Sequence, residues 1–184
     1  MNKIYLASRS PRRRELLQQL GVDFEVIDVE IDETWDEKEP PRRFIQRLAL
    51  EKARAGREII NNVAPVLAAD TEVILDGKLL GKPDNRDGAI DMLLTLSGRT
   101  HEVYSAVALI GQTENAVLSI SRVSFKPLKK AECETYCDSG EPFDKAGGYG
   151  IQGGAAAFVS RLEGSYSGVM GLPLYETAEL LKLL

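Results

Sequence analysis

The sequence contains few of the residues on which several common catalytic sites depend. Its 184 residues include one histidine, His101, and two cysteines, Cys133 and Cys137. With a single histidine, we expect neither a zinc site built from several histidines nor a His-based catalytic triad. The cysteines are four residues apart in a predicted helix, and no second Cys/His pair completes a metal site. We therefore interpret them as buried or neutral thiols in a reducing cytosol.

The sequence also lacks a positive net charge and long apolar runs. The net charge is −5 at pH 7, which argues against a general attraction to nucleic acid and would make a basic pocket a sign of a small anionic ligand. No apolar run approaches the ~20 residues of a membrane span. The first arginines follow the apolar start of the chain, unlike those of a secretory leader. We expect one domain over residues 1–184, cytoplasmic, without a stable nucleic-acid or membrane partner.

The first predicted helix has an unusual first turn. Ser10 and Pro11 are typical of an N-cap and a first helical position. The next three residues, Arg12–Arg14, are all cationic, although the positive end of the helix dipole disfavours each cation by about 0.3–1 kcal/mol. Either these arginines are solvated and merely tolerated, or they bind an anion together with the unpaired backbone N–H groups.

Predicted strands and helices are interleaved along the chain. The apolar pattern predicts strands over residues 4–7, 24–31, 66–75, 78–81, 102–110, 116–125 and 156–162. Helices are predicted from Pro11 to just before Gly21, over residues 41–60, 88–96 and 131–139, and from Pro173 onward. Asp76-Gly77 is typical of a two-residue hairpin turn. Interleaved elements with hairpin-like neighbours predict an α/β fold with a mixed sheet.

Two charged residues lie in otherwise apolar elements. Asp70 is inside the predicted strand 66–75, where it either caps the backbone at a strand end or acts as a general base or metal ligand. Lys52 falls near the middle of the apolar face of helix 41–60, where it either extends its ammonium group to solvent or meets a buried anion. Glu33 and Lys82 lie in loops, where a solvated side chain and a ligand contact are both open interpretations.

A glycine-rich segment, residues 144–154, contains a formal G-x-G-x-x-G pattern. We do not interpret it as a dinucleotide site, because polar Asp144-Lys145 precedes it and a predicted strand follows it. The loop is either a structural turn or a close backbone approach to a ligand, with the Gln152 amide as donor and acceptor. Cations, carboxylates and this loop, without a Walker A motif, fit metal-assisted attack of water on a phosphoryl group.

With these residues in place, the whole sequence resembles the Maf family of nucleoside triphosphate pyrophosphatases. The matching segments are Leu6-Ala-Ser-Arg-Ser-Pro-Arg-Arg13, Arg47-Leu-Ala-Leu-Glu-Lys-Ala53, Ala69-Asp-Thr71, Gly81-Lys-Pro83, Leu96-Ser-Gly98, Asp144-Lys-Ala-Gly-Gly-Tyr-Gly-Ile-Gln-Gly153 and Gly171-Leu-Pro173. So many matches in one order are highly specific. The resemblance implies a fold similar to the inosine triphosphate pyrophosphatases, with helices packed around a central cleft, and a homodimer.

The resemblance also implies the reaction and the residues that perform it. The family hydrolyses a nucleoside triphosphate between the α and β phosphates, with Mg²⁺ or Mn²⁺ as cofactor. Asp70 matches the catalytic acid–base position, and Glu33 matches a metal or water position beside it. Phosphate-contacting positions are matched by Ser8, Arg12, Arg13, Lys52 and Lys82. Arg12, Thr71 and Gln152 match the branch that acts on dTTP and UTP, not the branch that acts on 7-methyl-GTP.

The resemblance is not perfect, and other functions are conceivable. Arg9 stands where the family often has a small residue, and Arg14 matches no functional position. One alternative function is a nucleotide-binding regulator of septum formation that does not turn its ligand over. The other is removal of non-standard purine triphosphates such as ITP. Thr71 and Gln152 argue against this second function, because they match the branch that acts on dTTP and UTP.

Overall fold

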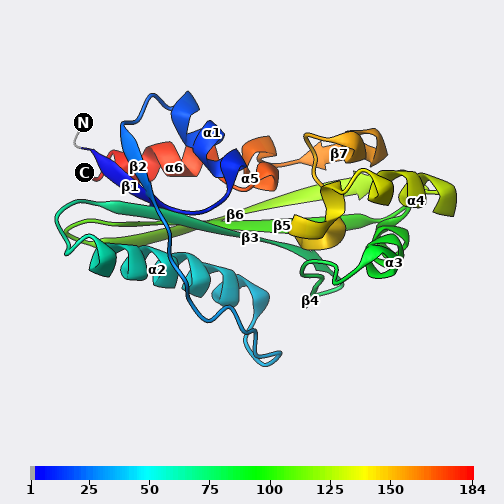
Figure 1. The fold of residues 1–184 in the computed structure, drawn as a ribbon, viewed down its shortest axis with the longest axis horizontal. Helices are drawn as coiled ribbons and strands as arrows, with labels where there is room; N and C mark the ends of the chain where they lie inside the picture. Colours follow the sequence, from blue (N-terminus) through cyan, green and yellow to red (C-terminus); the bar gives the residue numbers. More distant parts are fainter. Residues whose placement is uncertain (1–2) are drawn as a thin grey trace.

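A seven-stranded mixed sheet forms the middle of the computed structural model, which describes residues 3–184 (Figure 1). Its strands are β1 (Ile4–Ala7), β2 (Phe24–Ile27), β3 (Val66–Leu75), β4 (Lys78–Leu79), β5 (Thr100–Ile110), β6 (Glu114–Phe125) and β7 (Val159–Glu163). The α-helices are α1 (Pro11–Gln19), α2 (Pro41–Ile59), α3 (Arg86–Leu96), α4 (Lys130–Asp138), α5 (Tyr166–Met170) and α6 (Leu174–Leu181). Short 3-10 turns occupy Glu141–Asp144, Ala146–Gly148 and Gly154–Phe158.

The sheet combines a parallel and an antiparallel half. Its strand order is β2-β1-β3-β5-β6-β7, and β4 pairs with β3 off this path. β1 runs parallel to β2 and to β3, whereas β3, β5, β6 and β7 pair antiparallel. The predicted α/β fold with a mixed sheet is confirmed.

Helices cover both faces of the sheet. The long helix α2 packs along one face, while α1, α5 and α6 lie on the other (Figure 1). The α2 side buries Phe44, Ile45 and Leu48 against small residues of the strands such as Ala68 and Ala106. A larger apolar core fills the opposite side and includes Leu16, Leu17, Leu93, Leu96 and Leu172. Of the helices in residues 3–184, none is long and apolar enough to cross a membrane.

The local signals of the sequence correspond to the observed ends of elements. The Ser10 hydroxyl accepts a hydrogen bond from the backbone N–H of Arg13, 3.5 Å away, as the N-cap pattern predicts. Asp76 and Gly77 have φ angles of 52° and 78°. Two positive φ angles in a two-residue loop are those that an Asp-Gly hairpin favours, so the predicted turn between β3 and β4 is confirmed.

Several predicted elements are shorter than expected, because their partners end first. β2 stops at Ile27 instead of Ile31, since its partner β1 ends at Ala7, opposite Ile27. β7 starts at Val159 instead of Ala156, since Val159 pairs with Phe125, the last residue of β6. The sequence analysis missed α5, a five-residue helix that Ser165 caps by accepting from the N–H of Gly168 at 2.9 Å.

The glycine-rich segment packs tightly against the sheet at Gly147. This residue has φ = +72°, and a Cβ built on it would lie 2.7 Å from Cγ2 of Val73. Its N–H donates to the carbonyl of Gly81 at 2.7 Å. The position therefore requires glycine for two reasons: a left-handed backbone and a close approach to β3.

Substitution at Gly147 tests this packing. We expect Gly147→Ala to destabilise the protein by about 2–4 kcal/mol, because left-handed strain adds to overpacking. The matched control is Gly21→Ala, with φ = +66° and nothing within 4 Å of the added methyl group, which should cost only about 1 kcal/mol. Urea denaturation measures both, and equal losses would contradict the packing argument.

Candidate active site

A gap in the sheet forms the cleft. Along one edge of β3, residues Val66–Ala68 pair with β1, and Ile74 and Leu75 pair with β4. Between these two pairings, residues 69–72 of β3 have no strand beside them on that edge within residues 3–184. A cavity of about 440 Å³ opens there, at the carboxyl end of β1 and the first turn of α1. Open α/β sheets commonly bind ligands at such a point.

Lys52 joins two carboxylates at the floor of this cavity. Its Nζ lies 2.6 Å from Oδ1 of Asp70 and 2.8 Å from Oε1 of Glu33. The side chains of Asp70 and Lys52 are only 8% and 13% exposed, whereas that of Glu33 is 54% exposed. Lys52 therefore meets a buried anion instead of extending to solvent. Partial burial alone would raise the pKa of Glu33, but the hydrogen bond and charge of Lys52 hold it below its usual range.

Glu72 is a half-buried residue with one buried carboxylate oxygen, Oε2, and it was not among the residues predicted from the sequence. It lines the same cavity as Asp70. Burial, and then the negative charge of Asp70, raise the pKa of Glu72 to about 8. The sequence does hold a signal for Glu72. Side chains two residues apart on a strand share a face, so Glu72 belongs to the same face of β3 as Asp70. Asp70 is the first residue to interrupt the apolar run of this strand, and it alone was predicted.

The three arginines of the first turn of α1 have different surroundings. The Nε of Arg13 donates to the carbonyl of Gly171 at 2.8 Å, and its Nη atoms contact hydroxyls of Thr71 and Ser8 at 3.4 and 3.5 Å. Burial lowers the pKa of Arg13, which the charge of Asp70 opposes. Arg12 lines the cavity and lies 3.6 Å from Asp144. Arg14 is exposed and lines neither this cavity nor the adjoining one.

Arg9 and Lys82 are two further cations that line the cavities. Arg9 is exposed and forms ion pairs with Asp28 and Glu30, just beyond β2. Lys82 is exposed, follows β4, and lines both the main cavity and an adjoining cavity of about 560 Å³. The structure thus brings all of the predicted phosphate-contacting residues to these two adjoining cavities, namely Ser8, Arg12, Arg13, Lys52 and Lys82.

The predicted specificity residues occupy different parts of the cleft. The Thr71 hydroxyl is 2.6 Å from that of Ser105, which donates to the carbonyl of Gly168 at 2.6 Å. Gln152 is exposed and lines the cavity from the glycine-rich loop. The N–H of Gly154, two residues further on, donates to the Glu141 carboxylate at 3.2 Å. Within residues 3–184 the Gln152 amide has no hydrogen-bond partner, and its loop is anchored by the hydrogen bond from Gly154 to Glu141.

His101 supports the cleft from the core. Its Nε2 lies 2.7 Å from the hydroxyl of Tyr149, whose side chain lines the cavity. Burial lowers the pKa of His101 to about 4, so the ring is neutral at physiological pH. The single histidine is thus a structural partner of the glycine-rich loop. Cys133 and Cys137 are free, buried thiols whose pKa values burial raises, as we expected for reduced cysteines.

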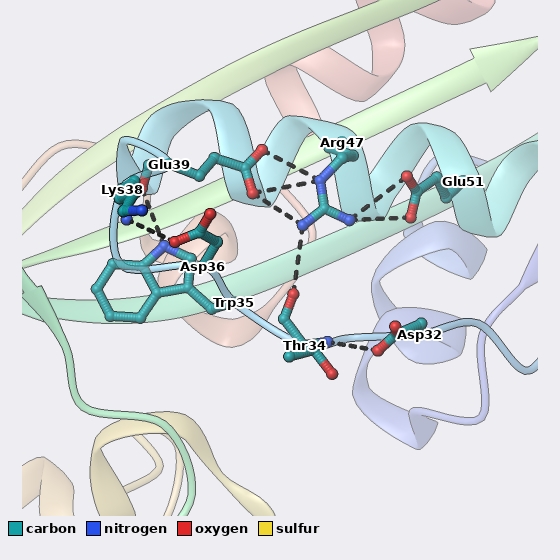
Figure 2. Close-up of polar contacts among 8 residues, drawn as sticks. All are labelled: Asp32, Thr34, Trp35, Asp36, Lys38, Glu39, Arg47 and Glu51. Carbon is teal, nitrogen blue, oxygen red and sulfur yellow. Dashed lines mark hydrogen bonds and ion pairs between the residues drawn. The ribbon is translucent and has the colours of Figure 1, made fainter.

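The loop that carries Glu33 is fastened to α2 by Arg47 (Figure 2). The guanidinium of Arg47 donates to Glu39 at 2.8–3.3 Å and to Glu51 at 3.2 and 3.4 Å. It also reaches the carbonyl of Thr34 at 3.4 Å, next to Glu33 in sequence. Trp35 closes the loop by donating from Nε1 to the Glu39 carbonyl at 2.9 Å. Arg47 therefore positions the segment from which Glu33 reaches Lys52.

The fold and the cleft together define a class: an α/β protein whose cleft places cations and a helix N-terminus over buried carboxylates. Within that class, the chain belongs to the Maf-like protein family, whose model matches residues 3–184. A dTTP/UTP pyrophosphatase of Alkalilimnicola ehrlichii is 55% identical over 97% of this chain and 91% of its own length. The dTTP/UTP pyrophosphatase of Aromatoleum aromaticum is 50% identical over 98% and 94%.

Two further comparisons extend this result. A nucleoside triphosphate pyrophosphatase of Xylella fastidiosa is 53% identical over 97% of this chain and 96% of its own length. Among solved structures, the Staphylococcus aureus Ham1 protein matches with a TM-score of 0.50 and 16% identity, over 67% of this chain and 72% of its own. At that identity the likeness concerns the fold alone, and it agrees with the predicted fold class.

Removal of the Arg47 guanidinium tests its hold on the loop. In Arg47→Met we expect the amides of Thr34, Lys38 and Glu39 to exchange with deuterium at least about tenfold faster, because a hydrogen bond to a charged group contributes about 1.5–3 kcal/mol. The matched control is Arg54→Met on the same helix, whose guanidinium pairs with Glu114 instead. Unchanged exchange in residues 32–39 of Arg47→Met would refute the positioning role.

Proposed function

We propose that this chain hydrolyses dTTP and UTP to the monophosphate and pyrophosphate, in the manner that its Maf relatives' names describe. Like those pyrophosphatases, it is a hydrolase. The observation that carries the proposal is the buried Asp70–Lys52 pair beside a cluster of cations at the start of α1. A triphosphate needs several cations at one place, and its hydrolysis needs a group that accepts a proton from water.

The start of α1 supplies the main contacts to the phosphates. In its first turn the N–H of Arg12 has no hydrogen-bond partner within residues 3–184, whereas the N–H groups of Arg13 and Arg14 donate to Ser10. The positive end of the helix dipole lies at the same place. Arg13 is already oriented by Gly171, and a guanidinium has five donors, so capacity is left for a phosphate. Arg12 and Lys82 also line the cavity, and Ser8 adds a hydroxyl in the adjoining one. These donors would stabilise charge on the leaving pyrophosphate.

The residues of the cleft also fit a divalent cation, Mg²⁺ or Mn²⁺. Oδ2 of Asp70 and Oε2 of Glu72 are buried and have no hydrogen-bond partner within residues 3–184. Carboxylate oxygens are the ligands that these hard cations prefer, and such sites commonly use one or two carboxylates together with substrate phosphates. When bound, the cation would polarise the phosphoryl oxygens and lower the pKa of a water molecule.

Asp70 is the residue that would take the proton. Its Oδ1 is fixed by Lys52, and its Oδ2 is unpartnered at the cavity. Water attacks the α phosphorus and forms a new P–O bond, the bond from that phosphorus to the α–β bridging oxygen breaks, and Asp70 accepts the water proton. The bridging oxygen leaves with pyrophosphate, stabilised by Arg12, Arg13, Lys52 and Lys82.

Substrate selectivity would come from the other side of the cleft. Gln152 has an exposed amide with both a donor and an acceptor, which can pair with the edge of a uracil-type base. Thr71 lies against Arg13 and Ser105, so its hydroxyl would act together with the arginine that it contacts. This supports the pyrimidine branch over removal of purine triphosphates. By the family resemblance, we also propose a cytoplasmic homodimer.

Hydrolysis itself separates this proposal from a regulator that only binds nucleotide. With dTTP and Mn²⁺, we expect the protein to release dTMP and pyrophosphate in equal amounts. Side-by-side turnover of dTTP, UTP, CTP, ITP and 7-methyl-GTP should rank dTTP and UTP highest. Binding without products would favour the regulator, and a preference for ITP would favour the purine alternative.

Loss of the base tests the mechanism. We expect Asp70→Asn to lower turnover of dTTP at least about 100-fold, the usual contribution of general base catalysis. The fold should persist, because asparagine keeps an oxygen for Lys52 and Glu33 still pairs with that lysine. Asp138→Asn, on the exposed part of α4, is the matched control. Near-normal activity of Asp70→Asn with an unchanged circular dichroism spectrum would overturn the assignment.

Removal of the Gln152 amide tests base recognition. Gln152→Ala should narrow the preference for dTTP over GTP by a few-fold to about tenfold, the effect of losing hydrogen bonds of about 0.5–1.5 kcal/mol each. The measurement is the ratio of kcat/KM for the two nucleotides, and Gln19→Ala, exposed at the end of α1, is the control. An unaltered ratio would show that Gln152 does not recognise the base.

A further inference from the structure

We propose that Glu72, together with Asp70, is the protein's binding site for the divalent cation, and that Glu33 serves to orient Lys52. This inference rests on the proposed function, because it names the residues that hold the cation of that reaction. The sequence analysis paired Asp70 with Glu33 for this purpose. The structure offers a different pair.

Position on β3 makes Asp70 and Glu72 neighbours. They are two residues apart on one strand, so their side chains share a face of the sheet and their backbones are separated by about 6.6 Å. Both line the main cavity. Thr71, between them, points to the other face, where it contacts Ser105 and Arg13. The two carboxylates are therefore carried by a single rigid element that faces the substrate cavity.

Each of these carboxylates has one oxygen without a partner. Oδ2 of Asp70 and Oε2 of Glu72 are both buried, and neither has a hydrogen-bond partner in the described part of the chain. Asp70 is 94% buried as a residue, since its relative exposure is 6%. Buried polar atoms of this kind are rare in native proteins, and leaving one unsatisfied costs about 1–3 kcal/mol or more for a charged group. A cation between them would satisfy both.

The charges of the pair support the same conclusion. Asp70 and Glu72 are two acidic residues on one face of β3, and both line the main cavity. Lys52 pairs with Asp70, whereas Glu72 forms no ion pair within residues 3–184. Two carboxylates that repel each other in a desolvated place are the arrangement that a divalent cation relieves.

Glu33 is less suited to be the second ligand. Its side chain is 54% exposed, and one of its oxygens lies 2.8 Å from Lys52. Glu33 instead orients Lys52, which in turn pairs with Asp70. Arg47 holds the loop that carries Glu33. Within residues 3–184 no three acidic, histidine or cysteine groups are arranged to hold an ion. The protein thus supplies two carboxylates, and the phosphates of the substrate would complete the coordination.

Asp70 can serve both the cation and the water. A carboxylate has about four lone-pair positions. One accepts from Lys52 at 2.6 Å, one would face the cation, and others remain for the water proton. Glu72 has no such contact with Lys52 and is left to the cation alone.

Binding of Mn²⁺ to the full chain tests this pair without reference to turnover. Titration with MnCl₂ alone, followed by the electron paramagnetic resonance signal of free Mn²⁺, gives the dissociation constant of each variant. We expect Glu72→Gln and Asp70→Asn to weaken binding at least tenfold. The control Glu33→Gln, which removes a carboxylate charge from the same cleft, should change it by less than threefold.

Thermal unfolding is a second measurement, which shows whether a variant has lost affinity for Mn²⁺ only because it has lost its fold. Without metal, Glu72→Gln and Glu72→Met should melt cooperatively, and Mn²⁺ should raise the Tm of the wild type more than that of either variant. Equal Mn²⁺ affinity of wild type and Glu72→Gln would overturn the inference, as would a greater loss in Glu33→Gln or the lack of saturable binding to the wild type. If the wild type also released no dTMP from dTTP, the proposed function would fail as well. If the wild type hydrolyses dTTP and Glu72→Gln binds Mn²⁺ with the affinity of the wild type, the assignment of Glu72 as a cation ligand would be refuted while the proposed function would stand.

Discussion

The buried ion pair between Lys52 and Asp70 is the contact on which the rest of the cleft depends. It joins α2 to β3 across a distance of 2.6 Å, at side chains that are almost fully buried. Removing Lys52 would leave the buried Asp70 carboxylate without its cation, a loss that costs about 3–5 kcal/mol in buried pairs. In the proposed reaction the pair would also orient the base, because Lys52 holds Oδ1 of Asp70 and leaves Oδ2 without a hydrogen-bond partner within residues 3–184. Glu33 contacts the same lysine at 2.8 Å. Arg47, which binds Thr34, Glu39 and Glu51, holds the loop that carries Glu33 (Figure 2).

A short strand creates the space for this arrangement. β1 has only four residues, and the chain turns from Ala7 directly into the cap of α1. The edge of β3 therefore stays open at Asp70 and Glu72, and the first turn of α1 lies above that opening. Arg12 and Arg13 stand at a helix end that would otherwise disfavour them. The nearby carboxylates of Asp70, Glu33 and Glu72 favour the positive charge of Arg13, and the triphosphate of the proposed function would favour both arginines.

Much of this could be predicted from the sequence, since its strongest signals are local. The Ser10-Pro11 cap, the Asp76-Gly77 turn and the apolar pattern of β3 and α2 each specify their own conformation, and a charged residue inside an apolar pattern identified Asp70 and Lys52. What could not be predicted depends on partners distant in the chain. The ends of β2 and β7 are set by the ends of β1 and β6, and α5 has too few residues for a periodic signal. Glu72 was not predicted for a different reason. It becomes a candidate ligand only because it lies on the same face of β3 as Asp70, two residues away, and the sequence shows this only when the two residues are considered together.

We propose that water, activated by Asp70, attacks the α phosphorus of a nucleoside triphosphate. The most direct measurement is hydrolysis of dTTP in water enriched in ¹⁸O, followed by mass spectrometry of both products. Attack at the α phosphorus places the new oxygen on that phosphorus, so the label should appear in dTMP and not in pyrophosphate. Label found in pyrophosphate would mean attack at the β phosphorus and would rule out the proposed reaction.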